Sequence, residues 1–425
     1  MAAEDWNRKT WRLAGPVMVS NISVPLLGAV DTAVVGHLPG PHFLGAVAVG
    51  ALVFSVLYHG CNFLRMGTTG LTAQSLGARD GDEVRAWLAR AGLLAVLVGG
   101  ALIALQAPVI WAALAVIDPS PQVRPLADAY FSIRIWGAPM ALANFVMLGW
   151  FFGIQNTRAA LATQVFMNGV NIALDLWFVI GLGWGVAGVA WATLISEVGA
   201  VAVGLWLVRR NLARLGGRWH LARAFDAARL LRMVRVNGDI MLRSLFLQAA
   251  FVALTAIGAR MGDVILAVNA ILLNFQVFMS YALDGFANAA EALTGEAIGA
   301  RDRGRFRDAV RATSRWALGL SVCFALLYLA GGGFIIDVLT GVAEVRTATR
   351  AYLPWAVALP LISVWSYQLD GIFIGSTWTA QMRNGMAFSL AVFAVALAAM
   401  VPGLGNHGIW LAFSLFMAAR GLTLG

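Results

Sequence analysis

Charge is scarce in this sequence. Charged residues make up 12% of its 425 residues and hydrophobic residues 60%, and the mean hydropathy is +0.78. Soluble globular proteins carry about 25% charged residues, so the composition excludes that class and indicates an integral membrane protein. Lysine is almost absent, with Lys9 alone among 30 basic residues. The basic residues cluster in alternate loops, which argues against nucleic acid as a partner and for orientation in a membrane.

Clusters of cysteine and of metal ligands are also missing. The two cysteines, Cys61 and Cys323, both fall in apolar spans, which excludes a disulfide framework. The sequence contains no glycine-rich phosphate loop with its lysine, no His-Glu-x-x-His and no Gly-x-Ser-x-Gly motif. We therefore expect neither an enzyme nor a protein with a cofactor.

Long apolar runs are abundant and give twelve candidate membrane spans. Their continuous hydrophobicity excludes a β-barrel, whose strands alternate between lumen and lipid faces. The predicted fold is all-α, with twelve transmembrane helices. The most basic loops follow the second, sixth and eighth spans, so we expect these loops and both termini on the cytoplasmic side.

An internal repeat divides the chain into halves. Thr72–Asp80 reappears 222 residues later as Thr294–Asp302 with five of nine positions identical, and the pair Gly149 and Gly153 recurs at the same offset. Six spans in each copy predict two six-helix lobes related by a pseudo-two-fold axis along the membrane normal, an arrangement typical of transporters. The predicted parts are an N-terminal lobe over residues 1–208, a basic linker helix over 209–239 and a C-terminal lobe over 240–425.

One carboxylate lies inside the first apolar span. Asp31 follows two prolines, Pro16 and Pro25, in a run long enough to cross a bilayer. An ionisable group at the centre of a membrane helix costs about 2.5–3.5 kcal/mol on insertion scales, so an acid kept there indicates a functional site. The prolines indicate a helix that bends. The alternative is an aspartate near the helix end that reaches the outer headgroups.

Three further polar residues share the depth of Asp31. Asn171 and Asp175 lie one helical turn apart on the fifth span, and Thr193 lies on the sixth. Counted from the outer helix ends, all four lie roughly 7–15 Å below the outer surface. Two carboxylates, an amide and a hydroxyl can hold protons or coordinate Na⁺, which predicts a cation or proton site. The alternative is that Asn171 and Asp175 only hydrogen-bond neighbouring helices.

A second set of acids lies in the C-terminal half. Asp284 and Glu291 share one face of the eighth span, and Asp370 lies in the tenth. These acids could line a substrate path, couple a second ion or pair with Arg243. The sequence slightly favours structural pairing.

Four stretches of the chain resemble one transporter family, and the likeness covers essentially the whole sequence. The stretches are Ser20–Leu38, Leu64–Gln74, Asp239–Ser244 and Tyr281–Phe286. They are similar to the multidrug and toxic compound extrusion (MATE) family and, within it, to the bacterial DinF branch. The resemblance implies a twelve-helix, two-lobe antiporter that expels amphipathic, often cationic aromatic compounds in exchange for H⁺ or Na⁺.

The resemblance also implies residue roles. The cation site of the family's N-terminal lobe falls here on Asp31, Asn171, Asp175 and Thr193. Some relatives bind Na⁺ through an acid inside the seventh helix, but here Asp239 lies only at the edge of that span. This difference favours H⁺ as the coupling ion, with Na⁺ possible at the same four residues.

Further residues are candidates for the substrate cavity and the hinge. The candidate cavity residues are Asn144, Asn168, Asp284, Glu291 and Asp370, of which the two asparagines resemble polar residues lining the N-lobe cavity of relatives. The candidate hinge residues are Pro16 and Pro25 of the first span, where Pro16 is the better match to the family's bending proline.

The expected partners are small amphipathic drugs and the lipid bilayer. We expect a monomer in the bacterial cytoplasmic membrane. The main alternative is a flippase for lipid-linked oligosaccharide, which would need a strongly basic cavity for pyrophosphate because anion clamps are rich in arginine. Few arginines lie inside the apolar spans: Arg65, Arg134 and Arg243. Each needs a partner, and Glu197 is one candidate.

Overall fold

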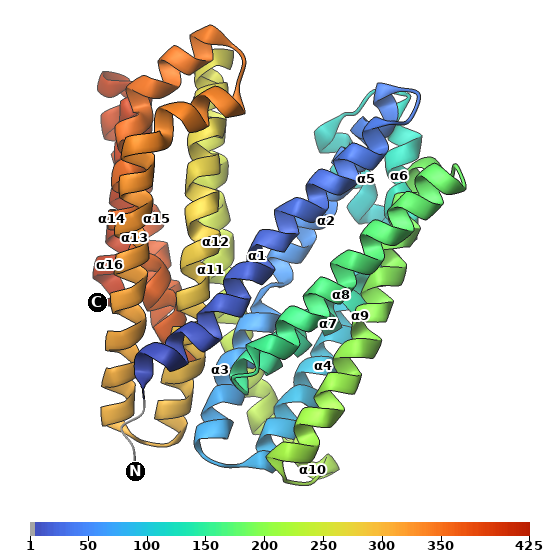
Figure 1. Cartoon of the computed structure of the whole chain (residues 1–425), viewed down its shortest axis with the longest axis vertical. Helices are drawn as coiled ribbons and strands as arrows, with labels where there is room; N and C mark the ends of the chain where they lie inside the picture. The colour runs from blue at the N-terminus through green and yellow to red at the C-terminus, as the bar shows by residue number, and fades with distance from the viewer. Residues whose placement is uncertain (1–4) are drawn as a thin grey trace. The chain divides into compact units, whose positions relative to one another are not determined.

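Two compact units make up the described part of the chain. The computed structural model describes residues 5–425, apart from the side chains of residues 24–26 and 29 (Figure 1). The N-unit is Val19–Val234, and the C-unit is the chain up to Met18 together with Arg235–Gly425. Both boundaries fall inside helices, namely α1 (Trp6–Gly36) and α11 (Ala227–Arg260). The domain boundaries expected from the sequence stay a prediction.

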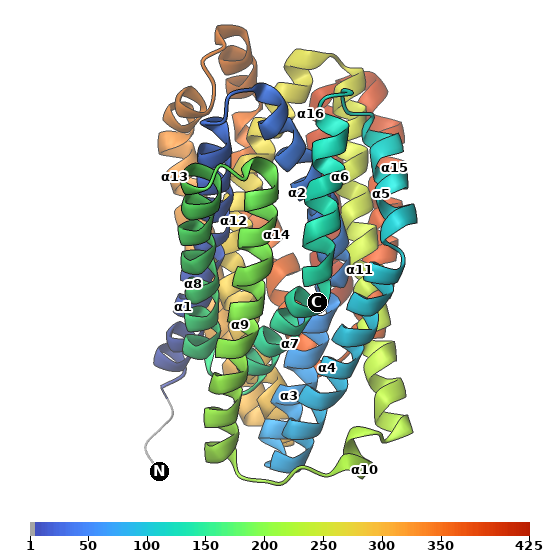
Figure 2. The ribbon, with the colours of Figure 1, turned by 90° about the vertical axis from the view of Figure 1, so that its right-hand side faces the viewer.

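The N-unit consists of helices that run along its length (Figures 1 and 2). Besides the second part of α1 and the start of α11, it contains α2 (Pro41–Cys61), α3 (Phe63–Gly77), α4 (Gly81–Ala104), α5 (Gln106–Ile117), α6 (Val123–Arg134), the 3₁₀ turn η1 (Ile135–Gly137), α7 (Ala138–Gly153), α8 (Thr157–Asp175), the π-helical turn η2 (Leu176–Gly181), α9 (Gly185–Leu215) and α10 (Leu221–Ala224). Three predicted spans therefore each consist of two consecutive α-helices.

The C-unit is built from longer helices. Besides the first part of α1 and most of α11, it contains α12 (Asp263–Gly299), α13 (Arg303–Leu339), α14 (Ala343–Ser376), α15 (Thr379–Leu404) and α16 (Asn406–Leu424). Its core is aromatic: Trp410, Phe413 and Phe416 of α16 are fully buried. These side chains form the centre of the unit, while large apolar residues on the outer sides of its helices, such as Phe334 and Val395, stay exposed.

The helices are long and apolar enough for a membrane. Among the described residues, eleven helical stretches are long and apolar enough to cross a membrane. In this count, α2 and α3 form one stretch, and α6 to α7 form another. The 31 residues of α1 are long enough to form the twelfth. The predicted all-α membrane fold is confirmed, and the chain is a multi-pass membrane protein.

The internal repeat is visible in the backbone. Arg79 and Arg301, which lie 222 residues apart, have φ angles of 57° and 56°. Gln155 and Thr377, separated by the same offset, have φ angles of 60° and 54°. Positive φ is uncommon outside glycine. Two helix-ending turns of the N-unit are therefore built again at the matching places of the C-unit.

The repeated glycines let helix backbones touch. A Cβ added to Gly149 of α7 would overlap the carbonyl oxygen of Arg65 on α3, and a Cβ added to Gly371 of α14 would overlap that of Ala287 on α12. These two contacts also match at the offset of 222. Close backbone approach at small residues is the usual way in which membrane helices gain van der Waals contact.

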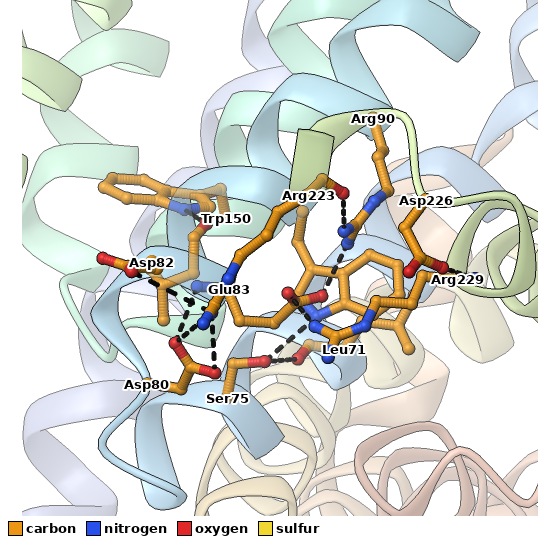
Figure 3. A network of polar contacts seen from close by, with 12 residues as sticks. Leu71, Ser75, Asp80, Asp82, Glu83, Arg90, Trp150, Arg223, Asp226 and Arg229 are labelled. Atoms are coloured by element: carbon orange, nitrogen blue, oxygen red, sulfur yellow. Dashed lines mark hydrogen bonds and ion pairs between the residues drawn. The ribbon is translucent and has the colours of Figure 1, made fainter. Parts of the chain in front are cut away.

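Acidic residues fix the linker to the N-unit. Glu83 of α4 accepts a hydrogen bond from Arg90 Nη1 at 2.6 Å and also pairs with Arg229 at the start of α11 (Figure 3). Arg223 of α10 lies 3.0 Å from Asp80 Oδ1. Because α10 and the start of α11 are both held, this part of the linker belongs to the N-unit.

The basic segment predicted as one linker helix, residues 209–239, is divided among three helices. It begins in the last turns of α9, passes through α10 and ends inside α11. Gly216 and Gly217 interrupt it with φ angles of 67° and 79°, values that end a helix. The amphipathic spacing in the sequence did not reveal this break.

Candidate functional site

Asp175 lies where α8 changes into the π-helical turn η2. Asp175 is fully buried, and Asn171, one turn earlier, is 1% exposed. The wider turn continues with a hydrogen bond from Leu182 N to Trp177 O at 2.9 Å. Single π turns are frequent at functional sites. Hydropathy gives no signal for such a turn, so the sequence could not predict it.

Asn171 connects α8 to α9. Its Nδ2 donates to Thr193 Oγ1 at 3.3 Å. When the amide is turned by 180°, Nδ2 instead donates to Asp175 Oδ2 at 3.1 Å, and the side-chain oxygen accepts from Thr193 N at 3.2 Å. The turned orientation gives both the nitrogen and the oxygen of the amide a suitable partner. In either orientation, Asn171 lies between Asp175 and Thr193, so the three predicted residues are together.

Asp31 of α1 completes the group. Its carboxyl group lies beside that of Asp175, close enough for the two groups to interact. Two adjacent carboxyl groups resist being ionised together. Asp31 is half-buried. The Oδ1 atoms of Asp31 and Asp175 are both buried and have no hydrogen-bond partner among the described residues. We call Asp31, Asn171, Asp175 and Thr193 the acid-pair site.

The predicted cavity residues of the N-unit are buried and hydrogen-bonded. Asn168 Nδ2 donates to Ser23 Oγ at 2.9 Å and so connects α8 to α1. Asn144 Nδ2 donates to the backbone oxygen of Glu197 at 3.2 Å, while its own side-chain oxygen is buried with no hydrogen-bond partner in the described part of the chain. Asn168 therefore positions the helix that carries Asp31.

The two predicted hinge residues belong to α1. Pro16 lies two residues before Met18, where the C-unit part of α1 ends. On the C-unit side, a Cβ added to Gly285 of α12 would lie 3.1 Å from the backbone oxygen of Ala14. The start of α1 is therefore packed closely on α12. Pro25 belongs to the residues whose side chains lie outside the described part.

The acids of the C-unit meet arginines. Asp370 of α14 accepts a hydrogen bond from Arg420 of α16 at 2.7 Å and also pairs with Arg243 of α11. Asp284 lies close enough for its charge to act on both guanidinium groups. Glu291 is 2% exposed and lies on α12, one helical turn after Asn288. The pairing of Asp370 with Arg243 agrees with the structural alternative stated above.

Two contacts of the C-unit were not foreseen. Arg420 is buried and lies over the ring of Tyr367. The available signal was a lone arginine in an otherwise apolar last span. Asp239, at the edge of the seventh span, pairs with Arg383 at 2.6 Å and accepts from Thr379 Oγ1 at 3.0 Å. Its carboxylate is therefore bound by side chains of α15.

Known proteins resemble the chain over nearly its whole length. The MatE family model matches residues 16–177 and 240–400. DNA damage-inducible protein F of Escherichia coli is 44% identical over 418 residues, covering 98% of this chain and 91% of that protein. The probable multidrug resistance protein NorM of Caulobacter vibrioides is 25% identical, covering 97% of this chain and 89% of that protein.

A solved structure shares the fold. A MOP superfamily transporter from Pyrococcus furiosus superposes with a TM-score of 0.88 at 22% identity, covering 99% of this chain and 94% of that one. Members of the matched family are transporters that couple to H⁺ or Na⁺ and are not enzymes. The family match and the near-full-length relative agree with the resemblance found in the sequence, and the chain belongs to the MATE family, within which it is similar to DinF.

Proposed function

We propose that the chain exports amphipathic, mostly cationic aromatic compounds in exchange for H⁺. The acid-pair site is the observation that carries the proposal. Two carboxyl groups lie side by side inside an apolar unit, and each has one buried oxygen with no hydrogen-bond partner among the described residues. Such a site gains from binding one more cation, because a second ionised carboxylate beside the first is costly. Names such as multidrug resistance protein among relatives support drugs as the substrates.

Alternating access is the proposed mechanism. In the outward-facing state, Asp31 and Asp175 take up a proton from outside, and the neutralised pair lets α1 bend and repack, which expels the bound drug. In the inward-facing state the proton leaves to the cytoplasm. A membrane potential of 100 mV adds about 2.3 kcal/mol for each charge moved inward. We place both termini in the cytoplasm and the protein, as a monomer, in the bacterial inner membrane.

Three interior arginines of the described helices already face carboxylates, which weakens the flippase alternative. Of the arginines in the apolar interior, Arg134 faces Glu197, and Arg243 and Arg420 face Asp370. Each of these guanidinium groups already has a carboxylate beside it. A pyrophosphate clamp would need several that do not, so drug export is the better supported function.

Replacement of Asp31 by Asn tests the proposed coupling. The variant keeps the size of the side chain but cannot lose a proton, so drug-driven proton release from proteoliposomes should fall to the background of empty vesicles. Asp175→Asn should do the same. Asp128→Asn, at an exposed position of α6, is the matched control and should exchange normally. Normal exchange by Asp31→Asn would show that the pair does not couple transport.

A further inference from the structure

Arg134 is a buried arginine that the acid-pair site does not account for. It is the last residue of α6, directly before the 3₁₀ turn η1. Its guanidinium carbon lies 4.5 Å from the ring centroid of Phe54, 5.7 Å from that of Tyr58 and 5.9 Å from that of Tyr130. Aromatic faces stabilise a cation without fixing its hydrogen bonds. The charge is therefore held in place largely by aromatic rings.

Glu197 is the carboxylate nearest to Arg134. It lies on α9 one turn after Thr193 and is 5% exposed. Its Oε1 lies 3.7 Å from Arg134 Nη2, which is too far for a hydrogen bond. Arg134 Nε and Glu197 Oε2 are both buried without a hydrogen-bond partner in the described chain. The pair is therefore close but loosely joined.

Gly137 makes room for this carboxylate. A Cβ at Gly137 in η1 would overlap Glu197 Oε2. The break between α6 and α7 thus places Arg134 three residues before Gly137, where the missing side chain leaves room for the carboxylate of Glu197. Asn144 of α7 donates a hydrogen bond to the backbone oxygen of Glu197.

Arg134 is connected by packing to the part of α1 that carries Asp31. Arg134 Nη1 donates to the hydroxyl of Tyr130 at 3.3 Å, and Val30, next to Asp31 in the chain, packs against the same apolar cluster as Tyr130. The groups that face Arg134 are Asp31 of α1, Tyr58 of α2 with Cys61 near it, Tyr130 of α6 and Glu197 of α9. Two acids on different helices therefore face one loosely held arginine.

We propose that Arg134 and Glu197 are positioning residues that set the cation affinity of the acid-pair site. The inference rests on the proposed function and deepens it. Arg134 acts as a counter-charge that Asp31 and Glu197 share. When Asp31 is ionised, its charge attracts the guanidinium group of Arg134. When Asp31 is neutralised, the guanidinium group interacts with Glu197 alone. An ionisable pair inside a membrane protein is expensive to keep, which favours such a role over packing alone.

Charge removal on the two sides should act in opposite directions. Arg134→Gln removes the positive charge near Asp31, so half-maximal transport should need about tenfold less of the coupling cation, which is H⁺ in our proposal. Glu197→Gln removes the second acid, so the full charge of Arg134 acts on Asp31. Half-maximal transport should then need about tenfold more of the coupling cation. The measurement is release of a preloaded fluorescent drug cation from proteoliposomes at a series of external concentrations of the coupling cation.

Control variants separate charge from packing. Arg134→Lys keeps the positive charge and should stay near the wild-type cation dependence. Arg210→Gln removes a positive charge from an exposed position of α9 and should also leave it unchanged. The double variant Arg134→Gln/Glu197→Gln should need a cation concentration for half-maximal transport that lies between those of the two single variants.

Shifts of both single variants in the same direction, or no shift, would overturn the inference. If Arg134→Gln does not accumulate in a folded form, the direction of the Glu197→Gln shift decides alone. The proposed function stands or falls separately. It fails if wild-type transport is independent of the coupling cation or if Asp31→Asn exchanges normally, whatever the Arg134 and Glu197 variants show.

Discussion

Asp31 and Asp370 are both acids in apolar helices, and their neighbours carry opposite charges. Asp370 is surrounded by the guanidinium groups of Arg243 and Arg420, so the protein itself supplies its counter-charge. Asp31 faces the carboxyl group of Asp175. Only the acid pair gains from a mobile cation. This difference is the reason that we propose ion coupling in the N-unit and a structural role for Asp370.

Loss of the charge on Asp370 should destabilise the C-unit. Asp370→Asn leaves Arg243 and Arg420 buried with less counter-charge, and breaking a buried ion pair costs about 3–5 kcal/mol. We expect a clearly lower midpoint of thermal unfolding in detergent. Asp128→Asn, exposed on α6, should leave the midpoint unchanged. An unchanged midpoint for Asp370→Asn would mean that the arginines do not depend on this carboxylate.

The sequence could predict the acid-pair site because its members obey simple rules. Asn171 and Asp175 are one turn apart, and helix length places Asp31 and Thr193 at a similar depth. Which arginine meets which acid could not be predicted. Arg420 reaches Asp370 from another helix, and that contact depends on how helices pack rather than on spacing along the chain.

Helix pairs in both units meet at matched glycines. Gly149 brings α7 against α3, and Gly371 brings α14 against α12. Van der Waals contact is a main source of attraction between helices in a membrane, since lipid is as apolar as the side chains. The repeated motif in the sequence is therefore a packing device as well as a mark of duplication.

A methyl group at either glycine should separate its helices. Gly149→Ala and Gly371→Ala should each lower the thermal midpoint, because the new Cβ would overlap a backbone oxygen of the facing helix. Gly100→Ala is the matched control, since its Cβ would meet nothing within 4 Å. Alanine stabilises a helix interior by about 1 kcal/mol over glycine, so the control should not lose stability. Equal midpoints for all three variants would refute the close packing.

The apolar spans were predicted at the level of elements, but their breaks were not. The second span is interrupted after Cys61, the third at Leu105 and the fourth by η1. Hydropathy reports how much apolar length is present and does not report changes in backbone hydrogen bonding. The turn that places Gly137 beside Glu197 is one such change, so the sequence could indicate Glu197 only as one candidate partner.

At the scale of the whole molecule, the repeat allowed the two-lobe fold to be predicted. A nine-residue motif and a glycine pair at one offset implied two copies of six helices, and matching φ angles recur at the same offset. The positions at which the chain passes between the units could not be read from hydropathy. They fall within α1 after Met18 and within α11 after Val234, where the apolar or basic pattern continues unbroken.

The central claim is that a proton gradient drives export through the acid-pair site. The most direct measurement is transport of one fluorescent cation by the wild-type protein in proteoliposomes, under an imposed pH gradient and, separately, an imposed Na⁺ gradient. We predict transport with the pH gradient alone and none with the Na⁺ gradient alone. Transport that follows the Na⁺ gradient and ignores the pH gradient would contradict the account.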